Sequence, residues 1–126
     1  MKREVFEYAV VRVVPRVERG ERVNAGVIVY CKARSFLAAR CALDVGRLRA
    51  LDAGVDVVGV ERALEAVELV CRGGEDAGVA GGEDAGRRFR WLTAPRSTIV
   101  QPGPVHTGLT ADPEAELEWL VASLVR

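Results

Sequence analysis

Three β-type runs near the start of the chain constrain its fold most strongly. Residues 5–14 (VFEYAVVRVV), 23–32 (VNAGVIVYCK) and 36–43 (FLAARCAL) are rich in β-branched and other apolar side chains. A charged segment with Pro and Gly, 15–22, separates the first two runs, and a short polar break separates the second from the third. Links this short join antiparallel neighbours, so the sequence predicts a three-strand antiparallel meander.

The second run contains a glycine among strong β-formers. Simple alternation predicts that one face carries Val23, Ala25, Val27, Val29 and Cys31. Gly26 and Asn24 fall on the other face, and a glycine inside a strand often marks a β-bulge or a close backbone approach. The simplest interpretation of Gly26 is structural. The alternative is the edge of a site that Asn24 forms with Arg12.

Helical periodicity follows the meander. Asp44, Asp56 and Asp112 each precede a helical apolar pattern, and Asp is a favoured N-cap residue. Pro113 follows Asp112, and proline is favoured at the first position of a helix. A β-prone stretch at residues 97–101 adds a fourth strand. The predicted fold class is therefore α+β, with an antiparallel β-sheet of the meander plus a fourth strand packed against two or three helices.

The apolar stripe of the last helix predicts its buried residues, which are Leu117, Leu120, Val121, Leu124 and Val125. Trp119 falls outside the stripe and is expected to be partly exposed. Phe89 and Trp91 alternate with arginines, a pattern that resembles single-strand nucleic-acid binders. Because the chain has only seven aromatic residues, we expect both rings to pack in the core and no nucleic-acid partner.

Residues 73–86 contain two copies of GGEDAG and little that could be buried. No Lys-Ser/Thr pair follows and no strand precedes, so we predict a flexible loop and not a phosphate-binding loop. Residues 102–109 (PGPVHTGL) are predicted to be turns. The length of 126 residues fits a single domain, 1–126.

Composition limits the environment and the chemistry. No apolar stretch approaches the ~20 residues that a membrane span requires, and the first residues do not resemble a signal peptide. We therefore expect a cytoplasmic protein with no membrane partner. Cys31, Cys41 and Cys71 form no CxxC pair, and His106 is the only histidine. Buried free thiols are expected, with no metal and no cofactor.

No catalytic motif is complete, although polar residues gather between Arg87 and Gly108. Ser97 and His106 lack the elbow motif of a hydrolase nucleophile, and His106 beside Gly and Pro is more typical of a turn residue. Arg96 with Ser97 suits a phosphate or carboxylate, or Arg96 bridges loop carbonyls. The candidate ligand- or partner-binding residues are Arg12, Asn24, Arg90, Arg96, Ser97, Gln101 and His106.

Two long blocks carry a family resemblance. They are YAVVRVVPRVERGERVNAGVIVYCKARSFLAAR and RFRWLTAPRSTIVQPGPVHTGLTADPEAELEWL. Both resemble the DUF3037 family of bacterial proteins of unknown function, with VNAGVIVYC and PRS…Q…PVH.G in the family's order and spacing. The resemblance implies no catalytic residues. It does imply an association with HipA-like kinase-fold proteins encoded nearby.

Two functions stay open. The leading prediction is a non-enzymatic accessory or protein-interaction domain whose partner is a HipA-like kinase-fold protein or a second copy of the chain. The alternative is a small ligand-binding protein or enzyme with a phosphate or carboxylate site near Arg96 and His106. Convergence of these two residues with Arg12 and Asn24 on one pocket would favour the alternative. If these residues lie far apart instead, the interaction domain is favoured.

Overall fold

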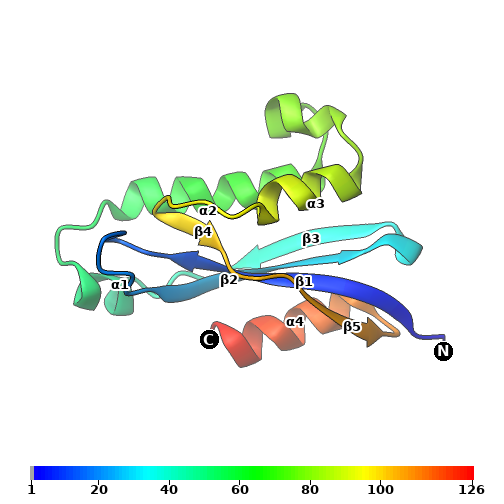
Figure 1. The fold of residues 1–126 in the computed structure, drawn as a ribbon, viewed down its shortest axis with the longest axis horizontal. Coiled ribbons are helices and arrows are strands. Elements are labelled where there is room, and N and C mark those ends of the chain that lie inside the picture. Colours follow the sequence, from blue (N-terminus) through cyan, green and yellow to red (C-terminus); the bar gives the residue numbers. More distant parts are fainter. Residues whose placement is uncertain (1) are drawn as a thin grey trace.

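A five-strand antiparallel sheet lies in the middle of the molecule (Figure 1). The computed structural model describes residues 2–126, apart from the side chains of Asp76, Val79 and Ala80. The strands are β1 (Glu4–Val13), β2 (Val23–Cys31), β3 (Phe36–Cys41), β4 (Val100–Pro102) and β5 (His106–Thr110). Their order is β3-β2-β1-β4, and β5 pairs with the other half of β1. The predicted meander and fourth strand are confirmed, and β5 is an additional strand.

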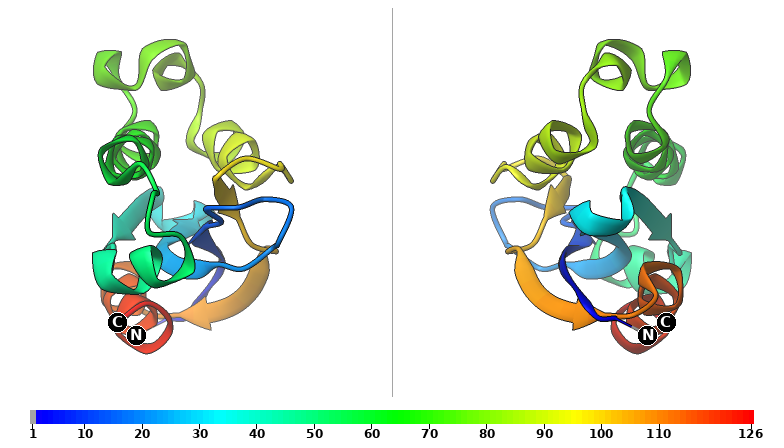
Figure 2. Two further views of the ribbon diagram at one scale, coloured as in Figure 1. Left: turned by 90° about the vertical axis from the view of Figure 1, so that its left-hand side faces the viewer. Right: turned by 90° about the vertical axis from the view of Figure 1, so that its right-hand side faces the viewer.

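Helices cover both faces of the sheet. They are α1 (Val45–Leu51), α2 (Val57–Arg72), α3 (Ala85–Thr93) and α4 (Pro113–Leu124), with short 3-10 helices η1 (Lys32–Arg34) and η2 (Glu75–Gly82). Figure 2 shows α2 and α3 side by side on one face and α4 on the other. The predicted caps are confirmed, because Asp44, Asp56 and Asp112 each accept a hydrogen bond from a backbone N–H of the following turn.

Two apolar cores therefore lie on opposite sides of β1 and β2. The α2 side includes Val11, Val13, Ile28, Tyr30, Leu48, Val60, Leu64, Phe89 and Leu92. The α4 side includes Phe6, Val27, Val29, Cys31, Leu117, Leu120, Val121 and Val125. Burial on both faces explains why the first two strands carry apolar residues at nearly every position.

A β-bulge at Ala25 changes which face of the sheet the odd-numbered residues of β2 point to. Val11 lies opposite Gly26 and Arg12 lies opposite Asn24, so Ala25 is an extra residue between the two pairs. Ala25 packs in the α2-side core, whereas Val27 packs in the α4-side core. The prediction that the odd-numbered residues of β2 share one face is therefore wrong, because alternation is interrupted at the bulge.

Two predicted loops contain regular structure. Within residues 73–86, η2 consists of two 3-10 segments that meet at Gly78, and α3 already begins at Ala85 behind the N-cap Asp84. The predicted turns at 102–109 are wrong beyond Val105, since β5 begins at His106. Pairing with β1 stabilises that strand despite its weak β-propensity.

Two predicted core residues lie at the surface. Trp91 is 54% exposed and Leu124 is 38% exposed, while Phe89 is fully buried. Trp119 is 63% exposed, as predicted. None of the helices in residues 2–126 combines the length and apolar character that crossing a membrane requires.

The close contact between β2 and β3 predicts a sensitive position. A Cβ at Gly26 would lie 2.7 Å from Cys41 Sγ and 3.0 Å from the Arg40 carbonyl oxygen. We expect Gly26→Ala to lower the free energy of unfolding by about 1–3 kcal/mol, because the buried backbone cannot move away. Gly82→Ala is the control, since a Cβ there meets no atom within 4 Å. Urea unfolding of both variants measures the difference, and equal stabilities would contradict this packing.

Candidate functional site

The sheet separates the candidate residues into two groups. Arg12 lies directly opposite Asn24 on β2 and Gln101 on β4, so these three form a row across adjacent strands. The row is on the α4 face, because Asn24 Nδ2 donates to the Leu124 carbonyl oxygen at 3.0 Å. His106 is on the same face, opposite Tyr8, with the two ring centroids 5.2 Å apart.

Arg90, Arg96 and Ser97 belong to the opposite side, with α2 and α3. Ser97 and Arg96 border a groove beside α2, and Arg90 is on α3. Arg96 and His106 therefore lie on different faces of the sheet and form no common pocket. The Ser97–His106 pairing considered as a nucleophile and base is not assembled for the same reason.

The Arg12 guanidinium lies against the backbone at Gly103. A Cβ on Gly103 would be 2.9 Å from Arg12 Cζ, so a larger residue at this position would make the Arg12 guanidinium shift. Arg12 Nε is enclosed and has no hydrogen-bond partner within residues 2–126. Burial and the neighbouring Arg22 cation lower the pKa of the Arg12 guanidinium. Arg12 is thus a partly enclosed cation with a second cation, Arg22, close enough to affect it.

Arg96 is held by the end of α3. Its Nη2 donates to the Trp91 carbonyl oxygen and its Nε donates to the Ala94 carbonyl oxygen at 3.3 Å. Its guanidinium also lies 5.2 Å from the centroid of the Trp91 ring. This geometry corresponds to the bridging of loop carbonyls, which was the structural interpretation of Arg96. These contacts join Arg96 and Trp91 into one unit, called the Trp91–Arg96 unit below.

An apolar groove with a volume of about 700 Å³ adjoins this unit. Its floor is one face of α2, where Gly59, Ala63 and Ala66 are small. Its rim carries three apolar side chains that are half-exposed, namely Val17, Trp91 and Ile99. Sequence reasoning missed the groove because it placed Trp91 in the core. The small residues repeating along α2 were the available signal.

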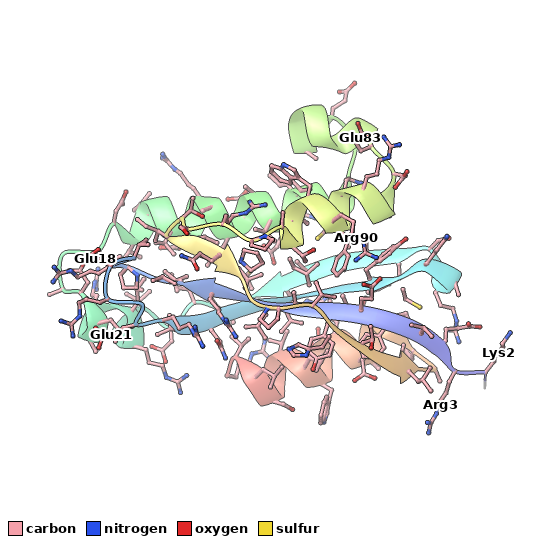
Figure 3. All side chains as sticks on the ribbon, in the orientation of Figure 1. Lys2, Arg3, Glu18, Glu21, Glu83 and Arg90 are labelled. Carbon is pink, nitrogen blue, oxygen red and sulfur yellow. The ribbon has the colours of Figure 1, made fainter. Side chains whose placement is uncertain are left out.

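A second, polar pocket surrounds Arg90. Figure 3 shows the Arg90 side chain, which extends from α3 to the Glu7 carboxylate of β1 with bonds of 2.8 and 2.9 Å. The hydrogen bond with Glu7 raises the pKa of Arg90. Arg88 likewise donates to the Val70 and Cys71 carbonyl oxygens at 2.8 and 2.7 Å. Arg88 and Arg90 therefore attach α3 to α2 and to the sheet.

The three cysteines are free thiols on apolar elements. Cys31 and Cys71 are buried and Cys41 is half-buried. Burial, together with the Glu68 carboxylate, raises the pKa of Cys41 to about 12, and burial raises that of Cys71 to about 12 against the lowering effect of Arg88. Thiols held neutral in this way are poor nucleophiles. Within the described residues, no group of three or more His, Cys, Asp and Glu side chains has the arrangement of a metal site.

These features define an α+β domain with an apolar groove on one face of an antiparallel sheet and a row of polar residues on the other. Comparison with known families identifies it further. DUF3037, a family of proteins of unknown function, matches residues 8–125, and the chain belongs to this family. No curated protein and no solved structure matches the chain.

Raised thiol pKa values predict slow chemical modification. Near pH 8 we expect iodoacetamide to label Cys41 and Cys71 at least about 100-fold more slowly in the folded protein than in urea, because the thiolate is the reactive form. Mass spectrometry of the alkylated peptides measures each rate. Labelling of the folded protein at the unfolded rate would contradict the burial of these side chains.

Proposed function

We propose that the chain is a non-enzymatic protein-interaction domain that binds its partner in the apolar groove. The observation that carries the proposal is the ring of half-exposed Val17, Trp91 and Ile99 around a concave surface. Single exposed apolar residues are common on proteins, but their grouping around a groove is typical of a binding site.

The Trp91–Arg96 unit supports an interaction role. Tryptophan and arginine are the residue types that contribute most often to binding energy at protein interfaces. Arg96 is already held by two carbonyl oxygens and by the Trp91 ring. Because both side chains are restrained before binding, they lose little conformational entropy when a partner covers them.

The shape of the groove suits an amphipathic helix of the partner. The small residues Gly59, Ala63 and Ala66 allow close approach along α2, which is the requirement for docking a helix in a groove. Arg96 is the one cation in the described lining, and Asp56 is the one acid. Asp56 caps α2 by accepting from the Gly59 N–H. We therefore expect an apolar helix face with an acidic residue beside Arg96.

The family resemblance suggests the partner, a HipA-like kinase-fold protein encoded nearby. The competing function, a phosphate or carboxylate site that joins Arg96 to His106, receives less support. Arg96 and His106 lie on opposite faces of the sheet, so they cannot hold one anion together. Dispersal of the candidate residues was the arrangement expected for an accessory domain.

The two exposed tryptophans allow a matched test. In calorimetric titrations with the neighbouring HipA-like kinase-fold protein, we expect Trp91→Ala to weaken binding at least about tenfold, or ~1.4 kcal/mol. Trp119→Ala, on the outer surface of α4, is expected to leave affinity within about twofold, because it lies away from the groove. Both variants should melt close to the parent protein.

Equal loss of binding in both variants would contradict the groove as the contact surface. If Trp91→Ala binds with unchanged affinity, the groove is likewise not the contact surface. If the parent protein shows no binding to the kinase-fold protein, the proposed partner is wrong.

A further inference from the structure

Arg12 and Arg22 are neighbouring cations, and Arg22 comes two residues before Asn24, the partner of Arg12 on β2. Other arginines of the described chain do have an acid beside them, as in the ion pairs Arg16–Glu18, Arg19–Glu21, Arg40–Glu114 and Arg90–Glu7. Within residues 2–126, neither Arg12 nor Arg22 makes an ion pair. Figure 3 labels Glu18 and Glu21 in the β1–β2 connection, where both acids are already bound to Arg16 and Arg19.

The enclosure of Arg12 makes this lack of a partner costly. Its Nε is cut off from solvent by the approach of Gly103 and has no acceptor. An N–H group that loses hydration without gaining an acceptor destabilises the folded protein, and a like charge nearby adds to the cost. An anion supplied from outside would offset the repulsion between the two cations.

The neighbours of Arg12 leave room for such an acceptor. Helix α4 packs mainly on β2 and β3, and the part of β1 that belongs to its core is Phe6, at the other end of the strand from Arg12. The Asn24 amide group already has a partner, because its Nδ2 donates to the Leu124 carbonyl oxygen. On the other side of Arg12, Gln101 presents an amide from β4. The surface therefore combines two cations and an amide near the Val13 end of β1.

We infer that this surface binds an oxyanion, a carboxylate or phosphate, through the Nη groups of Arg12 together with Arg22 and the Gln101 amide. The guanidinium fork suits both anions, because each offers two oxygens to parallel N–H donors. The site lies on the opposite face from the apolar groove and does not depend on the proposed protein interaction. The anion is either free in solution or carried by an acidic side chain of another molecule.

Two probes distinguish these sources in an amide-resolved NMR titration at low ionic strength. They are inorganic phosphate and a triglutamate peptide with blocked ends. We expect saturable shifts of the Gln101 and Gly103 amides with at least one probe. Saturation by phosphate indicates a free oxyanion, whereas saturation by the peptide alone indicates carboxylates on a chain.

Three substitutions test the assignment of residues. Arg12→Gln is expected to weaken binding at least about tenfold, and Arg22→Gln, on the exposed connection, at least about threefold. Arg72→Gln is the control, because Arg72 is an exposed arginine at the end of α2 on the opposite face. It should bind as the parent protein does. Without an added anion, Arg12→Gln should melt no lower than the parent, because it removes a like-charge contact.

Three results would overturn the proposal. The first is the absence of saturable shifts with both probes. The second is an equal loss of affinity in Arg72→Gln, which would show a general charge effect. The third is a fall of several degrees in the melting temperature of Arg12→Gln while Arg22→Gln still binds normally, which would make Arg12 a structural residue.

Discussion

The bulge where β2 passes Arg12 determines how the two faces of the sheet differ. One additional residue, Ala25, enters β2 between the partners of Val11 and Arg12. Beyond it, β2 supplies valines to the α4-side core, and before it Asn24 is turned to the α4 face. Gly26 makes this possible, since its missing side chain lets β3 approach at Cys41. Without the bulge, Asn24 and Arg12 would not share a row.

Arginine serves different purposes within this small fold. Arg88 and Arg90 hold α3 in place through backbone carbonyls and the Glu7 carboxylate. Arg96 stiffens the connection that follows α3 and lies on the Trp91 ring. Arg12 alone among these four has an enclosed donor without an acceptor. Arg96 borders the apolar groove, whereas Arg12 lies on the opposite face of the sheet.

Local signals in the sequence predicted most of the fold. The N-caps and the meander depend on short stretches of chain, so Asp56 and Asp112 could be recognised directly. Features that depend on distant partners were missed. Strand β5 forms because β1 is beside it, and Trp91 is exposed because Phe89 fills the core under α3. The candidate residues were identified by type, but their division between two faces follows from strand pairing that the sequence does not display.

Hydrogen–deuterium exchange tests most directly the claim that the α2–α3 face is the contact surface. On addition of the proposed partner, a HipA-like kinase-fold protein, slower exchange is expected in peptides that contain residues 57–70 and 91–100, while β5 exchanges at its original rate. Exchange is the appropriate measurement because it reports every backbone segment without altering a side chain. Protection confined to β5 and α4, or protection in neither region, would contradict the account.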